Sequence, residues 1–150
     1  MEGVMGKHLN NGRSKSKING RFIALPHSVV DSPGFQALSP MGVAVYIAAL
    51  RLYSGSNNGM LALSTHSIAK PMNVSHMSVS RALRELVNCG LLRKMQPSSF
   101  SKKRLAAEYR LTHLPCHKTN QPPTHEYRTH GQVVVSKAAV GAAVSEAVTA

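Results

Sequence analysis

Between Ser75 and Asn88, polar side chains that could bind a partner share one side of a segment whose other side is apolar. The apolar residues recur at three- and four-residue spacing, which is typical of the buried face of a helix. They are Val79, Ala82, Leu83, Leu86 and Val87. The other side carries His76, Met77, Ser80, Arg81 and Arg84. An arginine there could donate two parallel hydrogen bonds to paired acceptors, so this side is a candidate recognition surface.

Basic residues outnumber acidic ones: 18 Lys and Arg stand against 6 Asp and Glu, which gives a formal net charge of +12. Such an excess favours a polyanionic partner, either nucleic acid or an anionic membrane surface. The acidic residues are scattered singly, and neither a glycine-rich phosphate loop nor a nucleophile motif is present. We therefore expect a binding protein and not an enzyme.

Histidine and cysteine residues gather between positions 113 and 130 and invite comparison with a metal site. They are His113, Cys116, His117, His125 and His130. Structural zinc sites repeat paired ligands around a small hydrophobic module, and no such module surrounds these residues. We expect no metal, no cofactor and no small-molecule ligand. We also expect Cys89 and Cys116 to be free thiols, because two isolated cysteines offer no disulfide framework.

Apolar segments long enough for a membrane are missing from the sequence. The basic segment Met1–Arg21 is not followed by an apolar run of the kind found in a secretory signal. The longest apolar stretch, Met41–Leu50, is shorter than the roughly 20 residues that span a bilayer. We therefore expect a cytoplasmic protein without membrane contact.

Capping residues predict the helices that must position the recognition surface. Ser39 and Pro40 favour a helix start, and the apolar pattern that follows predicts a helix to about Tyr53. A second helix is expected over Thr65–Met72. Ser75 caps a third helix that runs to about Asn88, where a glycine supplies a left-handed stop.

Alternating residues predict strands after this helix. Leu91–Gln96 and Ala107–Thr112 form a hairpin with a polar loop, and Met60–Leu63 is short enough to be a single strand. We expect three regions along the chain: a disordered basic arm over 1–20, a folded domain over 21–112, and a flexible tail over 113–150 that could end in a weak helix.

The segment from Ile68 to Leu83 resembles the helix-turn-helix of bacterial repressors. The resemblance rests on Ala69, on Val74-Ser75 and on Val79-Ser80-Arg81-Ala82-Leu83. With the hairpin it implies a mainly α fold with a small β hairpin, a winged helix-turn-helix, over residues 39–112. More loosely, Arg21–Pro26 and Asn57–Gly59 resemble small helix-turn-helix proteins of plasmids, prophages and conjugative elements, among them winged-helix repressors of conjugative transfer.

Two positions at the end of the second helix distinguish this chain from that family. Asn73 stands where the family usually has glycine, and asparagine is the next best residue for a left-handed backbone. Pro71 is the larger departure, since a proline in a regular helix interior costs about 3 kcal/mol. We therefore expect the helix over 65–72 to be short or kinked.

The resemblance implies a role for each candidate residue on double-stranded DNA. Base-reading positions are His76, Met77 and Arg81. Phosphate-contacting positions are Ser75, Ser78, Ser80, Arg84, Lys102, Lys103 and Arg104. A minor-groove arm could include Arg13, Lys15 and Lys17.

Several functions remain open at this point. The resemblance implies a transcriptional regulator, most of all a repressor on a bacterial mobile element, located with the nucleoid and able to act as a homodimer. A plasmid or phage replication or excision accessory protein would use the same motif. A winged helix could instead bind another protein. Arg81 and Arg84 could also form an ordinary solvated face that pairs with Glu85 or Glu108.

Overall fold

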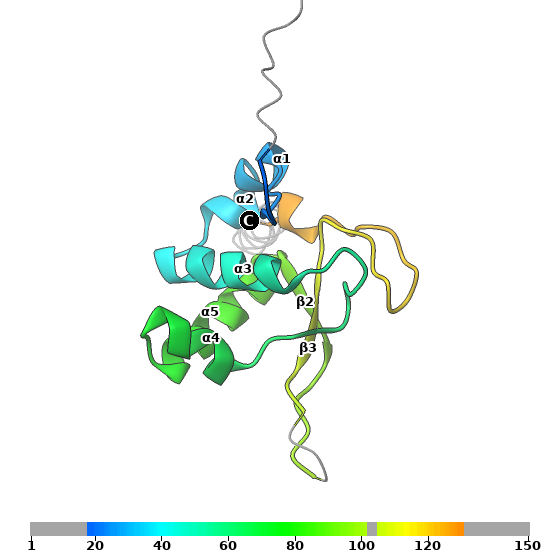
Figure 1. Cartoon of the computed structure of the whole chain (residues 1–150). Coiled ribbons are helices and arrows are strands. Elements are labelled where there is room, and N and C mark those ends of the chain that lie inside the picture. The colour runs from blue at the N-terminus through cyan, green and yellow to red at the C-terminus, as the bar shows by residue number, and fades with distance from the viewer. Residues whose placement is uncertain (1–17, 102–104, 131–150) are drawn as a thin grey trace, which may run out of the picture.

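Three helices of seven or more residues accompany a three-stranded antiparallel sheet in the computed structural model, which describes residues 18–101 and 105–130 (Figure 1). The longer helices are α3 (Pro40–Leu52), α4 (Thr65–Met72) and α5 (His76–Asn88). Single turns form α1 (His27–Val30), α2 (Pro33–Gln36) and the 3-10 helix η1 (Glu126–Arg128). The strands are β1 (Leu61–Ala62), β2 (Leu92–Gln96) and β3 (Glu108–Leu111).

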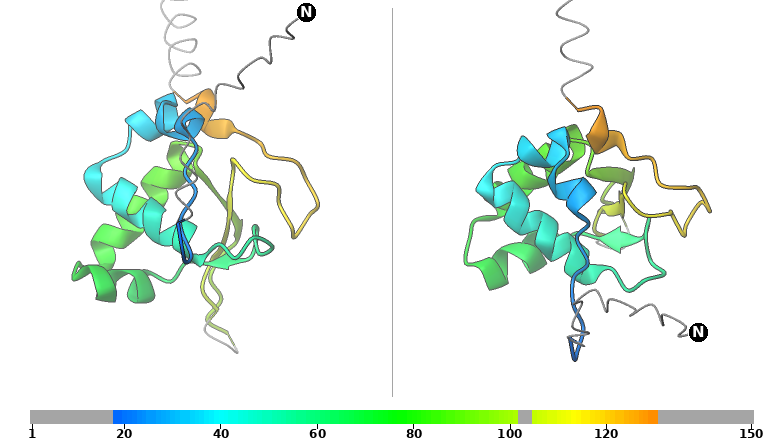
Figure 2. Two further views of the ribbon diagram at one scale, coloured as in Figure 1. Left: turned by 45° about the horizontal axis from the view of Figure 1, so that its top comes forward. Right: turned by 90° about the horizontal axis from the view of Figure 1, so that it is seen from above.

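The sheet has the strand order β1-β3-β2, with both neighbours antiparallel to β3. We expected a mainly α chain with a small hairpin, and this expectation needs correction to a mixed α/β fold. The reason is that β1 does not stand alone: Leu61 pairs with Tyr109 and extends the hairpin to three strands. The sheet then packs one face against α5, and the free end of its β2–β3 hairpin projects from the body (Figures 1 and 2).

The predicted helix bounds are confirmed, because local capping decides them. The hydroxyl of Ser39 accepts a hydrogen bond from the Gly42 N–H at the start of α3. Asn73 adopts the left-handed conformation, with φ of 52°, and turns the chain between α4 and α5. Pro71 lies in the last turn of α4, two residues before this turn, and α4 is only eight residues long. The helix thus continues past the proline and ends at Asn73, where the turn is intact.

Buried apolar residues from α3, α5 and the sheet form one core. The predicted buried face of α5 is confirmed, since Val79, Leu83 and Leu86 are at most 4% exposed. The almost uniformly apolar sequence of α3 predicts burial on several sides, and this expectation is wrong: α3 buries one face, which includes Val45, Tyr46 and Ala49, whereas Ile47 and Leu52 are 37% and 46% exposed. The helix packs directly against α5. Cys89 and Cys116 are both buried free thiols.

Residues 113–130, the C-terminal strap, pack on the domain. We expected a flexible tail from residue 113, and this part of the expectation is wrong. Tyr127 is 1% exposed and belongs to the core, while η1 lies beside α2 (Figure 1). The prediction relied on the low apolar content of the segment, whereas one aromatic ring and a set of polar contacts hold it. Residues 131–150 of the expected tail and residues 1–17 of the expected arm lie outside the described residues.

Two buried polar side chains attach the strap to the sheet. Asn58 donates to the carbonyls of Leu111, Leu114 and Pro115 at 2.9–3.2 Å and accepts from the Leu111 N–H at 2.6 Å. Arg110, only 1% exposed, donates to the carbonyl of Pro122 at 3.0 Å. Because β3 alternates its side chains between two faces, Arg110 points away from Tyr109 and toward the strap. The strap therefore covers the sheet face opposite α5.

Replacing Tyr127 with alanine should lower the free energy of unfolding by about 3 kcal/mol, since it empties a fully buried aromatic position. Urea denaturation measures this change. Tyr127→Phe is the matched control: it keeps the ring and loses only the 2.7 Å hydrogen bond to His125 Nδ1, which should cost about 1 kcal/mol. An unchanged midpoint for Tyr127→Ala would show that the strap does not unfold with the domain.

His113 should make the protein sensitive to acid. Burial, with a smaller contribution from His125, lowers the pKa of His113 from 6.5 to about 4, and its Nδ1 lies 3.2 Å from the Tyr46 hydroxyl. A depressed native pKa stabilises the fold fully above pH 6.5, and this stabilisation is lost as the pH falls toward 4. Between these values unfolding should become easier by about 3 kcal/mol. Urea titrations at pH 7.5, 5.5 and 4.5 measure the slope.

His113→Gln should flatten that part of the pH profile, because glutamine does not titrate. His27→Gln, which changes an exposed histidine on α1, is the control and should keep the slope. Equal slopes for His113→Gln and the unmodified protein would assign the acid sensitivity to other groups.

Candidate functional site

The outward side of α5 is the candidate site. His76, Met77, Arg81 and Arg84 are exposed there, as predicted, and the Met77 side chain is 65% exposed. Ser80 is half-buried, so it lies at the edge of this surface. The orientation follows from the apolar strip on the other side of the helix, which the core fixes. The helix thus presents two guanidinium groups and one imidazole to the exterior.

Ser75 and Ser78, predicted to contact phosphate, are engaged with each other. The Ser75 hydroxyl accepts from the Ser78 N–H at 3.1 Å, and the two hydroxyl oxygens are 2.9 Å apart. This arrangement is an N-cap, which satisfies backbone groups at the first turn of α5. Ser75 and Ser78 therefore have a structural role at the start of α5.

A stacked histidine pair joins α4 to α5. The rings of His66 and His76 have centroids 5.0 Å apart and planes inclined by 11°. His66 was not among the predicted site residues, and the sequence gives no periodic signal for it, since the contact depends on the angle between the two helices. The stack fixes the direction of the His76 ring at the start of α5.

Glu85 lies one helical turn after Arg81, but its carboxylate contacts α3 and not an arginine. Its carboxylate accepts from the N–H of Ser39 at 2.5 Å and from the Ser39 hydroxyl at 2.7 Å. A side chain at Gly42 would come within 2.8 Å of the same carboxylate, so glycine leaves room for this contact. Glu85 therefore binds Ser39, the N-cap residue of α3, from the neighbouring helix.

Arg81 and Arg84 have no carboxylate partner in the part of the chain that the structure describes. The ion pairs found there join Arg93 to Glu126 and Lys118 to Glu108. The alternative that the α5 arginines pair with Glu85 or Glu108 is therefore wrong. Both guanidinium groups keep their donors available to a partner.

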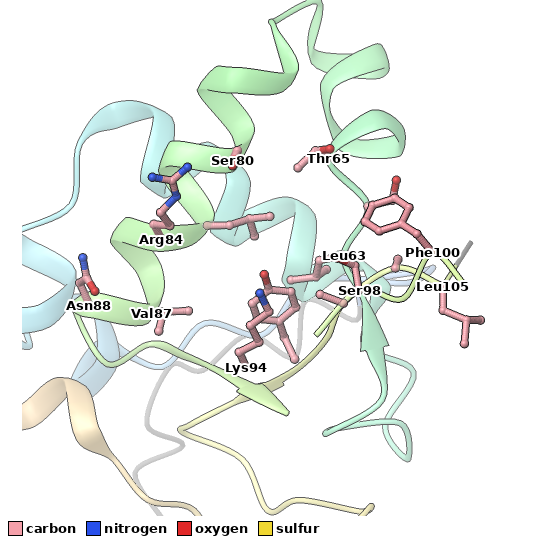
Figure 3. A pocket seen from close by; sticks show the side chains of 15 residues that line it. Leu63, Thr65, Ser80, Arg84, Val87, Asn88, Lys94, Ser98, Phe100 and Leu105 are labelled. Atoms are coloured by element: carbon pink, nitrogen blue, oxygen red, sulfur yellow. The ribbon is translucent and has the colours of Figure 1, made fainter. Parts of the chain in front are cut away.

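A groove of about 650 Å³ lies between α5, the start of α4 and the hairpin (Figure 3). Arg84 and Ser80 line it from α5, and Lys94 lines it from β2. Phe100 and Leu105 border it from the projecting end of the hairpin. Lys94 and Phe100 were not predicted as site residues. For Phe100 a signal existed, because a lone aromatic residue among serines in a polar loop has no core to join.

The remaining predicted site residues lie outside residues 18–101 and 105–130. These are Arg13, Lys15 and Lys17 in the expected arm, and Lys102, Lys103 and Arg104 in the hairpin loop.

The described ranges hold neither a metal-binding cluster nor a membrane-spanning helix. There, no three side chains of His, Cys, Asp or Glu come together as a metal site would require. No helix within those ranges has the length and apolarity needed to cross a bilayer.

Comparison of the chain with protein-family models, with curated proteins and with solved structures finds no match.

Substitutions on α5 should distinguish a residue that stabilises the fold from exposed residues that do not. Glu85→Ala removes both hydrogen bonds to Ser39 and should lower the free energy of unfolding by about 1 to 2 kcal/mol. Arg81→Ala and Arg84→Ala remove exposed groups without carboxylate partners and should change it by less than about 0.5 kcal/mol. Urea denaturation of the three variants tests this difference. An arginine variant as destabilised as Glu85→Ala would give the arginine a structural role.

Proposed function

We propose that this protein binds double-stranded DNA in a sequence-specific manner as a winged helix-turn-helix transcriptional regulator, with α5 in the major groove. The observation that carries the proposal is the outward strip of α5. Arg81 and Arg84 stand there without a carboxylate partner in the described residues, and the nearest acidic residue on the helix is bound to Ser39. Exposed arginines without a carboxylate partner attract a polyanion.

The arrangement of elements supports this assignment. Two helices joined by a left-handed turn at Asn73, with the second helix exposed on one side, are the arrangement that a helix-turn-helix needs. The projecting β2–β3 hairpin stands beside α5, where a wing would lie (Figure 1). In this interpretation, α4 crosses the DNA backbone and α5 enters the groove.

The dimensions and chemistry of α5 fit the major groove. Its 13 residues make a rod about 20 Å long, and the groove is about 12 Å wide. Arg81 can donate two hydrogen bonds to O6 and N7 of a guanine, while His76 and Met77 are close enough to the helix start to meet neighbouring bases. Arg84 and Lys94 line the groove on the protein beside the hairpin, and their positive charges suit contacts with DNA phosphates.

Regulation by repression follows if the bound site overlaps a promoter, because the occupied major groove then excludes polymerase. One module of this size reads few base pairs, so two copies on a two-fold symmetric site would supply the specificity that a regulator needs. We therefore propose that the protein acts as a homodimeric repressor. Because the chain also resembles, more loosely, proteins of mobile elements, we propose that its operator lies on such an element.

Arg81→Ala should weaken binding to a selected duplex by about 10- to 100-fold, because a bidentate contact to guanine contributes about 1 to 3 kcal/mol. The test selects the best 40-base-pair duplex from a random pool with the full chain, then measures affinity by gel shift at 150 mM salt. Binding of both proteins to a scrambled duplex should stay similar.

Arg51→Ala is the matched control, since Arg51 is an exposed arginine on α3, away from the strip. It removes the same charge and should leave selected-duplex affinity within about 3-fold. Equal losses for the two variants would mean that charge alone is sensed and that α5 reads no base. Failure of the unmodified protein to bind any duplex would reject the DNA-binding function.

A further inference from the structure

The groove between α5 and the sheet has a helical wall that combines apolar and polar side chains. The residues of α5 that line it recur at three- and four-residue spacing, which places them on one side of the helix. They are Ser80, Leu83, Arg84, Val87 and Asn88. The groove has a volume of about 650 Å³, and sites for small molecules typically have about 300 to 1,000 Å³. Its size therefore suits one small molecule.

The opposite wall is a row of apolar side chains from the sheet. Leu105, Ala107 and Tyr109 are two residues apart along the chain, and all three line the groove. Ala107 and Tyr109 are buried, whereas Leu105 at the outer end of the row is 53% exposed. Lys94 of β2 pairs with Tyr109, so the two side chains lie on the same face of the sheet. A cation thus stands beside an apolar row that is partly open to solvent.

The positive charge of the groove is not balanced by any described residue that lines it. Arg84 lies on the α5 side and Lys94 on the β2 side (Figure 3), and none of the described lining residues is acidic. Glu108 is adjacent to Tyr109 in β3 but points to the other face of the sheet, where it pairs with Lys118. The groove therefore presents two positive charges beside apolar walls.

These two features together select the chemistry of an occupant. A carboxylate can accept two parallel hydrogen bonds from a guanidinium such as that of Arg84, and it can pair with the ammonium group of Lys94. Inorganic phosphate would meet the cations but leave the apolar walls in water, whereas a neutral apolar molecule would leave the cations unpaired. A small molecule with an apolar body and one carboxylate matches both features.

We propose that this groove binds a small amphipathic carboxylate. The apolar body lies against Leu83, Val87 and Tyr109. The carboxylate lies at Arg84 and Lys94, where the Ser80 hydroxyl and the Asn88 amide offer further donors. The sequence gives no sign of such a site, because the walls come from segments that are separate along the chain.

A second part of the inference rests on the proposed function. Arg84 and Lys94 are the groups that we assign to DNA phosphates, so a bound carboxylate competes with DNA for them. The ligand therefore weakens DNA binding and acts as an inducer.

The site is tested on the full chain without DNA, and the probe is 2-naphthoate. Titration calorimetry should show saturable binding with a dissociation constant below about 1 mM. The uncharged analogue 2-naphthylmethanol should bind at least about 10-fold more weakly, because it has the same apolar body and lacks the carboxylate. Absence of saturable binding, or equal affinity for the two compounds, would overturn the site.

Variants of the two walls separate the charge from the apolar contact. Lys94→Gln should weaken 2-naphthoate about 5- to 10-fold and leave 2-naphthylmethanol within about 2-fold, since only the charge is removed. Leu105→Ala should weaken both compounds about 3- to 5-fold, because it shortens the apolar wall. Lys70→Gln changes an exposed lysine on α4 that does not line the groove, and it is the matched control. Equal losses for the two lysine variants would assign the binding to overall charge and overturn the site.

Methyl NMR locates the bound probe. Saturating 2-naphthoate should shift the methyl signals of Leu83, Val87 and Leu105. Shifts confined to residues outside the groove, such as the 46% exposed Leu52 on α3, would place the compound elsewhere and overturn the site.

Gel shift with the selected 40-base-pair duplex tests the competition. At ten times its dissociation constant and constant ionic strength, 2-naphthoate should weaken duplex binding about 10-fold, because each ligand excludes the other. Unchanged duplex affinity with the groove occupied would overturn the competition. Failure of the ligand-free protein to bind any duplex would reject the proposed function alone, since the calorimetry contains no DNA.

Discussion

The carboxylate of Glu85 reaches from α5 to the first turn of α3 and accepts two hydrogen bonds from Ser39. Because the same hydroxyl of Ser39 accepts from the Gly42 N–H, one chain of hydrogen bonds caps α3 and attaches it to α5. The contact accompanies the rotation of α5 that its apolar strip sets, with Val79 and Leu86 facing the core. Arg81 and Arg84 then have to face outward.

A second set of polar contacts closes the other face of the sheet. Asn58 and Arg110 are buried, and each binds backbone carbonyls of the C-terminal strap. The Arg110 Nε has no partner in the described residues, and its charge is met there by carbonyl and amide oxygens and by no carboxylate. Removing such a group without a replacement leaves acceptors unsatisfied, so the strap depends on polar geometry as much as on Tyr127.

The sequence predicted those features that short-range rules decide. Ser39, Ser75 and Asn73 set helix ends and the turn through contacts within four residues, and the period of Val79, Leu83 and Leu86 set the buried side of α5. The strap could not be predicted in this way. Its main attachment, Asn58, lies more than 50 residues away along the chain and reads as an ordinary turn residue.

The candidate site shows the same limit. Its outward residues follow from the helical period, whereas the His66–His76 stack and the groove that contains Lys94 depend on how separate elements meet. Phe100 could be predicted only in part. Its type is unusual for a polar loop, but only the hairpin pairing shows that it stands beside the same groove as Arg84.

The distribution of acidic groups explains how a small domain keeps one surface cationic. Of the four acidic residues in the described ranges, Glu85 binds Ser39, Glu108 binds Lys118 and Glu126 binds Arg93. Each of these contacts joins segments distant in sequence, so the carboxylates serve the fold. Arg81 and Arg84 are the cationic groups of the outward strip of α5, with the Glu85 carboxylate one helical turn after Arg81, and Arg84 and Lys94 are the cationic groups of the groove beside it. The acidic residues therefore act as structural acceptors, and Arg81, Arg84 and Lys94 are left without a carboxylate partner in the described residues.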